Sequence, residues 1–539
     1  MREIGLIALF PLRIIYVVEI GLFQGRFMLN FTDWLSSYNG PRVLIAQLQV
    51  LSGGSLVTRY VSTHTVTVDS VEYLPFIKGT LQINTAINLE FGASMSVGGL
   101  DLINSDKYID SWLNDNWVNK SCKVYVGPLP GSYTNQSLSN DYELVLDGVT
   151  EDIDSKSLNV LSLKLRDKLE KVNYPVTEAI LGNYFHGSIL ADDSATYNNP
   201  AKTSIKPLVF GEVHNITPLS TDPTQLEYMV SDGPVERIIE VLDNGVPVVF
   251  RTVKTVAEVG DIPPGSFRLN SSPVGTVTAS VQGVAKTINI SGNTYVDSYT
   301  NTASNIIATI LKLYGKQLQY SELDSTSFSS LGSAPVGVYL KDRTNAFVVC
   351  GEVAKSINCA LVVSPKGVVK LVEVKLPTAA SISINDTNTV LNTMKLNSKT
   401  DVDAGVRLGY ARNYTVMSGI VTGIPEEHKQ LLSTEYMEIV VKDTTAATDY
   451  NITVEPDLEA TYLITSADAT SKANDRLALR NKPRKVLAIQ GVLELMQLEA
   501  GTPVVVDINR FGISTGSLGL VLSTRPDWVT GKIDLEILV

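Results

Sequence analysis

Apolar and polar residues alternate in short runs over the first third of the chain, from Arg42 to about Val160. The alternation is clearest at Leu81, Ile83, Ile87, Leu89 and Phe91. Because side chains point to opposite faces of a strand in turn, this pattern predicts strands with one buried face, assembled into a small barrel or sandwich. We assign residues 28–165 to a first β-barrel module. The segment Ser111–Trp117 carries two tryptophans between strands and is expected to pack over an open end of the barrel.

The strand signal fades between Asn173 and Lys206, where Asn, Ser, Ala and Pro are frequent, and residues 166–206 are therefore expected to form a linker or loop region. Strand-like runs resume at Pro207 and define a second β module, residues 207–297. Its strongest local signal is Asp243-Asn244-Gly245 between two apolar runs. Asn-Gly readily adopts the positive φ angles of a two-residue turn, so this sequence predicts a hairpin.

The period changes to that of a helix after Asn301, and Gly315 is a candidate C-cap. The residues with helical spacing are Ile306, Ile307, Ile310, Leu311 and Leu313. A second helix is expected over residues 345–358, followed by a hairpin with its turn at Pro365-Lys366-Gly367. This order of elements predicts an α+β module, residues 298–395.

Strand patterns return at Gly405 and continue to the end of the chain. Residues 396–539 are expected to form a second β-barrel module with one polar helix over residues 466–481. Ala469, Ala473 and Leu477 lie four residues apart and should form the inner face of this helix. The predicted fold class is thus mainly β with α+β insertions.

The first 27 residues differ from the rest, because Ile4–Phe23 is mostly apolar but carries Pro11, Arg13 and Glu19. No small-residue cleavage site follows, as a signal peptide would require. Each charge near the centre of a membrane helix would cost about 2.5 to 3.5 kcal/mol. We therefore predict no stable membrane insertion. Our hypothesis is that Met28 opens the natural protein and that residues 1–27 are an upstream extension.

Composition places the chain among globular proteins and argues against a nucleic-acid ligand. Its 539 residues are enough for three or four domains, and 44% are hydrophobic while 19% are charged. The formal net charge is −12 and no run of Lys or Arg could track a phosphate backbone. Tight binding of nucleic acid is not expected.

The sharpest catalytic match is Gly512-Ile513-Ser514-Thr515-Gly516, which fits the G-x-S-x-G nucleophile elbow. That motif needs a helix after it and a histidine later in the chain. The last histidine is His428, and the strand-like sequence GLVLST follows the motif instead. We therefore interpret Ser514 as part of a turn between two strands.

Other candidate chemistry is equally sparse, and no catalytic, cofactor-binding or metal-binding residue is predicted. The glycine pairs at 53–54 and 98–99 lack a phosphate-loop frame, and adjacent acids such as Glu151-Asp152 and Glu426-Glu427 are expected to be solvated. The histidines lack the spacing of a metal site; they are His64, His186, His214 and His428. The cysteines lack the spacing of a metal site and of a disulfide framework; they are Cys122, Cys350 and Cys359.

Three stretches nevertheless resemble the tail hub proteins of long-tailed bacteriophages, which share an architecture with contractile baseplate hubs. Residues 209–248 carry a Val-Phe-Gly-Glu strand, a Tyr-x-Val-x-Asp-Gly turn and a Val-x-Asp-Asn-Gly-Val hairpin. Residues 303–374 are similar to the mixed helical module of that family. The third stretch resembles its closing barrel and comprises residues 406–416, 474–489 and 510–539. With the Trp112–Tyr125 region, the likeness spans nearly everything from Met28 to Val539.

The resemblance implies two tube-like β-barrel modules joined by intervening modules, in a homotrimer. Three copies of two similar barrels would make a ring of pseudo-sixfold symmetry. Such a ring would contact distal tail or tail tube proteins above and fibre or spike proteins below. It would sit at the tip of the virion tail, after synthesis in the host cytoplasm. DNA would pass during ejection without specific binding, and carboxylates on the wall would keep it from adhering.

Two other classes of function stay open at this point. A receptor-binding adhesin, or another component of the tail tip, is compatible with many β modules and Tyr-rich loops, although fibrous repeats and long low-complexity stalks are missing. A cell-wall or polysaccharide hydrolase would need a pair of acids in a cleft, and such a pair is defined by spatial separation that a sequence does not show.

Overall fold

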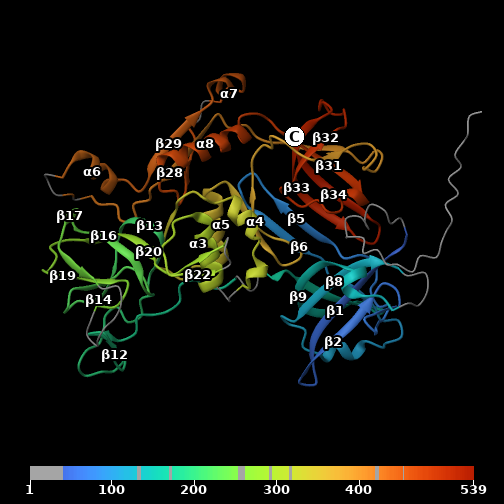
Figure 1. Cartoon of the computed structure of the whole chain (residues 1–539), viewed down its shortest axis with the longest axis horizontal. Coiled ribbons are helices and arrows are strands. Elements are labelled where there is room, and N and C mark those ends of the chain that lie inside the picture. Colours follow the sequence, from blue (N-terminus) through green and yellow to red (C-terminus); the bar gives the residue numbers. More distant parts are fainter. Residues whose placement is uncertain are drawn as a thin grey trace, which may run out of the picture.

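The computed structural model describes residues 40–129, 135–168, 173–252, 262–290, 294–314, 318–418, 420, 424–452 and 455–539. The hypothesis that Met28 is the natural start and the candidate C-cap Gly315 both lie outside these residues. The molecule is elongated (Figure 1). The first β module and the C-terminal strands within residues 485–538 lie together at one end, the 207–297 module lies at the other with residues 426–433 beside it, and a helical region separates the two ends.

The first module is built on a six-stranded antiparallel sheet. In spatial order its strands are β2 (Ser55–Ser62), β1 (Arg42–Ser52), β8 (Ser121–Pro128), β9 (Glu143–Ser157), β10 (Val160–Arg166) and β7 (Leu100–Ile103). Residues 74–78 connect the two edges: Leu74 N donates to Tyr60 O at 3.2 Å, and Ile103 N donates to Phe76 O at 2.6 Å. Residues 74–78 therefore link the two edge strands, and the sheet curves back on itself.

Two short elements complete this module. They are the hairpin of β3 (Val66–Val68) and β4 (Val71–Tyr73), and the one-turn helix α2 (Leu138–Asp141). The two tryptophans of the 111–117 segment are buried in the module's core, next to the 3-10 helix η1 (Asp110–Asn114). Trp117 Nε1 donates to the backbone oxygen of Trp112 at 2.8 Å, and the Arg59 guanidinium lies 4.6 Å from the Trp112 ring centre.

The last module is organised around an eight-stranded curved sheet. Its main path runs through β26 (Ile382–Ile384), β32 (Pro503–Val506), β33 (Ser517–Asp527), β34 (Lys532–Leu538), β31 (Lys485–Val492) and β27 (Lys395–Lys399). The remaining two strands are β5 (Ile83–Ile87) and β6 (Ala93–Val97), a hairpin from the first module that pairs with β33. The side chains of Thr85 and Thr524 are hydrogen-bonded at 2.8 Å across this contact.

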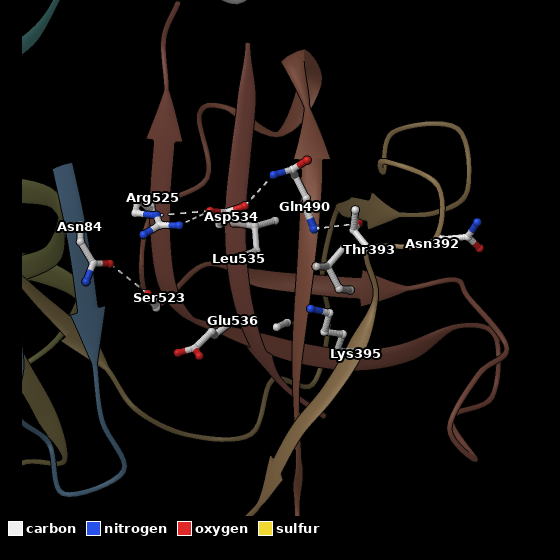
Figure 2. A pocket seen from close by; sticks show the side chains of 12 residues that line it. Asn84, Asn392, Thr393, Lys395, Gln490, Ser523, Arg525, Asp534, Leu535 and Glu536 are labelled. Atoms are coloured by element: carbon white, nitrogen blue, oxygen red, sulfur yellow. Dashed lines mark hydrogen bonds and ion pairs between the residues drawn. The ribbon is translucent and has the colours of Figure 1, made fainter. Parts of the chain in front are cut away.

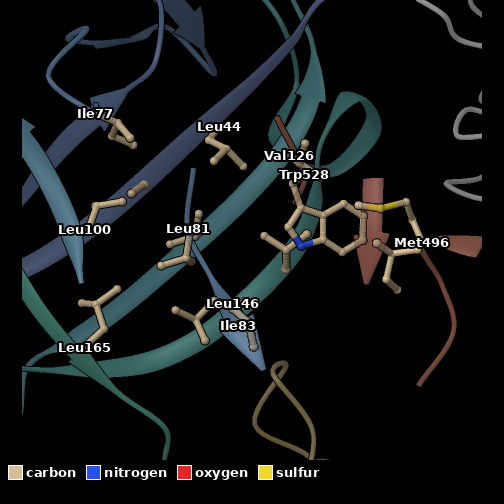
Figure 3. Close-up of a cluster of buried hydrophobic side chains, with 14 of the residues drawn as sticks. Leu44, Ile77, Leu81, Ile83, Leu100, Val126, Leu146, Leu165, Met496 and Trp528 are labelled. Carbon is tan, nitrogen blue, oxygen red and sulfur yellow. The ribbon is translucent and has the colours of Figure 1, made fainter. Parts of the chain in front are cut away.

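One buried cluster continues from the first sheet into the last. Leu44, Leu81 and Val126 from the first module share it with Met496 and Trp528 from the last (Figure 3). All five side chains are at most 7% exposed. Because apolar burial stabilises without regard to direction, this shared core joins two segments that are far apart in the sequence. The last sheet contains strands from three of the expected modules, residues 28–165, 298–395 and 396–539. That these modules fold as separate units stays a prediction.

The 207–297 module contains two antiparallel sheets. The first has the order β17 (Val246–Pro247), β16 (Val235–Asp243), β20 (Val277–Val284), β13 (Leu208–Ile216) and β23 (Gly337–Leu340). The second has the order β14 (Leu219–Asp222), β15 (Glu227–Met229), β19 (Ser266–Leu269) and β18 (Phe250–Thr252). Leu242 pairs with Pro247 across Asp243-Asn244-Gly245, which confirms the predicted hairpin.

Gly211 in the Val-Phe-Gly-Glu strand has a structural reason to be glycine. Its φ angle is +68°, a conformation that L side chains rarely adopt. A Cβ at this position would lie 1.9 Å from the backbone oxygen of Val336, next to β23. The glycine of this Val-Phe-Gly-Glu sequence, which is part of the resemblance to hub proteins, is therefore explained by the close approach of β13 to β23.

The helical region follows the predicted order of helix, helix and hairpin. Its elements are α3 (Ala303–Thr309), which continues as a π-helical turn η3 (Ile310–Tyr314), η4 (Tyr320–Glu322), α4 (Ser325–Ser330), α5 (Ala346–Ser356), and the hairpin of β24 (Cys359–Val363) and β25 (Val369–Glu373). Asn345 caps α5, because its Oδ1 accepts from Phe347 N at 2.8 Å and from Val348 N at 3.3 Å.

The 396–539 module also contains a smaller sheet. It consists of β29 (Met437–Lys442), β28 (Gly405–Tyr410) and β30 (Leu458–Ala460), accompanied by α6 (Glu426–Ser433), α7 (Thr444–Asp449) and α8 (Ser466–Arg480). Ala473 and Leu477 of α8 pack on Val406 and Leu408 of β28. Ala469 is also buried, so the predicted inner face of this helix is confirmed.

The remaining elements are short, and the fold class is confirmed as mainly β with α+β insertions. They are the hairpins β11 (Tyr184–Phe185) with β12 (Ser188–Ile189) and β21 (Thr287–Asn289) with β22 (Thr294–Val296), and the 3-10 turn η5 (Leu493–Leu495). Within the part of the chain that the structure describes, no helix has both the length and the apolar character to cross a membrane.

Candidate functional site

Ser514 lies in the connection between β32 and β33, and no helix follows it. Its backbone oxygen accepts from Ser517 N at 3.2 Å and from Ser517 Oγ at 2.7 Å. Gly512 and Gly516 both have positive φ angles, which suits a turn. The interpretation of this motif as a turn between two strands agrees with the structure.

The four histidines do not form a metal site among the described residues, where no group of three or more His, Cys, Asp or Glu could hold an ion. His64 and His186 lie apart from each other, in the first module and in the β11–β12 turn. His214 and His428, although 214 residues apart, line the same cavity between β13 and α6. Their spacing in the sequence carried no signal of this.

The adjacent acids and the cysteines have the environments of structural residues. Glu426 and Glu427 are exposed in the first turn of α6, and Glu426 pairs with Lys429 at 3.2 Å. The three cysteines are buried free thiols. Burial raises the pKa of Cys122 and of Cys359 to about 12, which keeps both thiols neutral and poorly nucleophilic.

The last sheet presents a polar face opposite its buried core. This face lines a hollow of about 610 Å³ (Figure 2). The side chains around it are Asn84, Asn392, Thr393, Lys395, Gln490, Ser523, Arg525, Asp534 and Glu536, together with Ala488, Ile489 and Leu535. They come from β5, β27, β31, β33 and β34 and from the loop before β27, so the hollow exists only because these segments share one sheet.

Hydrogen bonds hold the charged side chains of this polar face in position. Asp534 accepts from Arg525 Nη2 at 2.6 Å and from Gln490 Nε2 at 2.9 Å. Burial acts to raise the pKa of Asp534, but the hydrogen bonds from Arg525 and Gln490 outweigh burial and hold its pKa below the ordinary value. Asn397 donates to Glu536 at 2.8 Å. A face of paired charges and amides suits contact with water, and nothing in its geometry points to catalysis.

A buried ion cluster joins the helical region to α8. The Arg476 guanidinium is fully buried and donates to Glu459 at 2.5 Å, to Asn358 Oδ1 at 2.8 Å and to the backbone oxygen of Lys355 at 2.7 Å. Arg480 donates to the other oxygen of Glu459 at 2.7 Å. Burial acts to raise the pKa of Glu459, but the two arginines outweigh it and the pKa lies below its ordinary value.

This cluster has a structural role. Lys355 lies in the last turn of α5, so Arg476 satisfies a carbonyl at the negative end of that helix. Arg476 also contacts Glu459 of β30, so this one side chain connects α8 to both α5 and β30. Sequence reasoning missed these residues, because an arginine on a polar helix is usually exposed.

Searches with this sequence against protein-family models and against curated proteins found no match. Among solved structures, the chain is similar to a tail protein from Neisseria meningitidis MC58, with 11% identity, a TM-score of 0.34, and coverage of 92% of this chain and 96% of the other. It is also similar to a 43 kDa tail protein of prophage MuSo2 from Shewanella oneidensis, with 12% identity, a TM-score of 0.36, and coverage of 92% of this chain and 98% of the other.

A chain from the virion of a native gene transfer agent particle is also similar. It has 11% identity and a TM-score of 0.43, and the alignment covers 65% of this chain and 89% of the other. At such low identities and TM-scores, these likenesses do not assign a function to this chain.

Proposed function

We propose that this chain is a structural subunit of a bacteriophage tail, and specifically the hub that closes the tail tube at its tip. The observation that carries the proposal is the resemblance to tail hub proteins, in order and spacing, of residues 209–248, residues 303–374 and a third stretch comprising 406–416, 474–489 and 510–539. The proposed role is structural and not enzymatic. No catalytic residue or cofactor is needed for it.

The architecture supports the proposal in one respect. The first and last β modules form a single rigid pair, because they share one buried cluster and because β5 pairs with β33. A threefold axis acting on such a pair would arrange six β modules around a ring. In this proposal the ring joins distal tail or tail tube proteins above to fibre or spike proteins below.

The polar face of the last sheet is our candidate for the wall of the DNA passage. It carries Lys395 and Arg525 as well as Asp534 and Glu536, so its charges are balanced and not purely acidic. Balanced, internally paired charges would leave little free positive potential to hold a phosphate backbone. Passage of DNA without specific binding is consistent with this surface and with the net charge of −12.

An exposed apolar surface on the first module is our candidate for the contact between subunits. Leu158, at the β9–β10 turn, is 90% exposed, and Tyr108 is 63% exposed. Ile103 is 38% exposed and its backbone pairs with Val160, which places it close to Leu158. Exposed apolar surface of this kind is typical of interaction sites.

The test is the mass and shape of the purified protein by mass photometry and negative-stain imaging. We expect a ring with three times the chain mass, and we expect Leu158→Asp to convert it to monomers. Val274→Asp is the matched control, because Val274 is equally exposed, at 95%, but lies in the 207–297 module. A stable monomer that hydrolyses cell-wall material would overturn the proposal, and a monomer that binds host cells would favour an adhesin.

A further inference from the structure

A cavity of about 740 Å³ lies between the five-stranded sheet of the 207–297 region and the α6 segment, which we define as residues 411–418, 420 and 424–436. In Figure 1, α6 lies next to the β16–β17 hairpin. The walls of the cavity are of two kinds. The apolar wall comprises Leu242, Val246, Pro247, Ile424, Leu431 and Leu432, and the polar wall comprises His214, Asn215, Glu240, Ser280, Asn413 and His428.

The cavity is held open by a fixed framework. Asn215 Nδ2 donates to Asn413 Oδ1 and to the backbone oxygen of Thr415, both at 2.7 Å. Asn413 Nδ2 in turn lies within 3.1 Å of three carbonyl oxygens of the α6 segment, those of Leu431, Leu432 and Thr434. We call this network the amide clasp. It positions α6 over the sheet without filling the space between them.

Apart from the imidazole rings of His214 and His428, which can both donate and accept, the hydrogen-bonding groups left over on the polar wall are acceptors. Both protons of the Asn215 amide and both protons of the Asn413 amide are used within the clasp. The Ser280 hydroxyl donates to Glu240 Oε1 at 3.0 Å. In contrast, Asn215 Oδ1 is buried without a partner among the described residues, although Asn215 is only 4% exposed. A buried acceptor without a partner is costly.

These acceptors meet at one place. Asn215 lies on β13 and Glu240 on β16, and Ser280 lies on β20, the strand between them. Ser280 Oγ contacts both of its neighbours, since it also accepts from Asn215 N at 3.4 Å. The second carboxylate oxygen of Glu240 has no hydrogen-bond partner among the described residues. Among the described residues that line the cavity there is no Lys or Arg, and Glu240 is the only Asp or Glu.

We propose that this cavity binds a primary ammonium group carried on an apolar stem. The ammonium, with three protons and no acceptor, would donate to the free carboxylate oxygen of Glu240, while the stem would lie against Leu242, Leu431 and Leu432. A free alkylamine and a lysine side chain of another protein share this chemistry. The inference does not depend on the proposed role in a phage tail.

The test is calorimetric titration of the full chain with n-pentylammonium chloride, and with n-pentanol and sodium pentanoate as matched neutral and anionic probes. We expect saturable binding of the ammonium and at least tenfold weaker binding of the other two. A second arm titrates the acetylated and amidated tripeptide Gly-Lys-Gly against the same peptide with norleucine in place of lysine. If the lysine peptide binds more tightly than pentylammonium, the natural occupant is a lysine side chain. If pentylammonium binds more tightly, the natural occupant is a free amine.

Two variants make the result decisive. Glu240→Gln keeps the hydrogen bond with Ser280 but removes the charge, and it should weaken ammonium binding by about tenfold. Glu427→Gln removes an exposed carboxylate from α6 that does not line the cavity, and it should leave binding unchanged. The proposal is overturned if neither amine binds saturably, if pentanol binds as tightly as the ammonium, or if the two variants behave alike.

Discussion

The junction between the first and last sheets is apolar, whereas the junction between the α6 segment and the 207–297 module is made mainly of amides and hydroxyls. At the first junction, Trp528 and Met496 are buried in the same cluster as Leu44 and Val126. At the second, a small apolar cluster accompanies the amide clasp, consisting of Leu242, Met417 and Leu432 with Ile420 at its edge, and Tyr414 packs against the core of the 207–297 module. The first junction is filled, and the second encloses a cavity of about 740 Å³.

The difference between the two junctions teaches what each kind of contact can do. Close-packed apolar surface couples two segments strongly and transmits strain, so the two sheets should unfold together. Hydrogen bonds are directional and net only about 0.5 to 1.5 kcal/mol each, so they can hold α6 at a distance and leave a binding space. In our proposals, the rigid junction serves assembly of a ring and the open one serves ligand binding.

The largest effect is expected at the apolar junction. Trp528→Ala should lower the free energy of unfolding by about 3 to 5 kcal/mol, because it removes a large buried side chain and leaves a cavity. Chemical denaturation measures this loss. Hydrogen exchange should become faster in both β1 and β34, and faster exchange confined to the last module would contradict the coupling between the two sheets.

A comparably large effect is expected at the buried ion cluster, a third junction, which is polar. Glu459→Gln leaves the Arg476 guanidinium buried without its countercharge and should cost about 3 kcal/mol at neutral pH. Denaturation of the variant and of Glu438→Gln measures this. Glu438 is the control because it forms a half-exposed pair with Arg407 and should change stability by less than about 1 kcal/mol.

The loss of stability in Glu459→Gln should also depend on pH. Because the folded pKa of Glu459 is lowered, its carboxylate stabilises the fold above its ordinary pKa of about 4.3, and this contribution is lost as the pH falls through the folded pKa. The stability difference between wild type and Glu459→Gln should therefore be constant near neutral pH and shrink below about pH 4. A difference that grows on acidification would mean that the carboxylate is not stabilised by the arginines.

A smaller and local effect is expected at the amide clasp. Asn413→Ala removes the donor to three carbonyl oxygens and should cost about 1 to 3 kcal/mol. Hydrogen exchange should accelerate in α6 and leave the two β sheets of the first junction unchanged. Global acceleration after this substitution would show that the polar junction is as strongly coupled as the apolar one.

Local patterns were sufficient to predict many individual elements. The Asn244-Gly245 hairpin, the β24–β25 hairpin, the helix α5 and the inner face of α8 each depend on residues within about one or two turns of one another. The turn at Ser514 also followed from its neighbours. Such features are encoded locally because backbone preference and the period of apolar positions act over short distances.

What the sequence by itself determined is therefore the mainly β fold class, the order of strands and helices, and the absence of a recognisable catalytic motif. Tertiary structure alone decided that β5 joins β33, that His214 and His428 line one cavity, and that Asn215 meets Asn413. These contacts join residues about 200 to 440 positions apart, and each depends on how whole sheets pack. A single sequence carries no periodic signal for such pairs, because packing energy is shared by many side chains and identifies no particular partner.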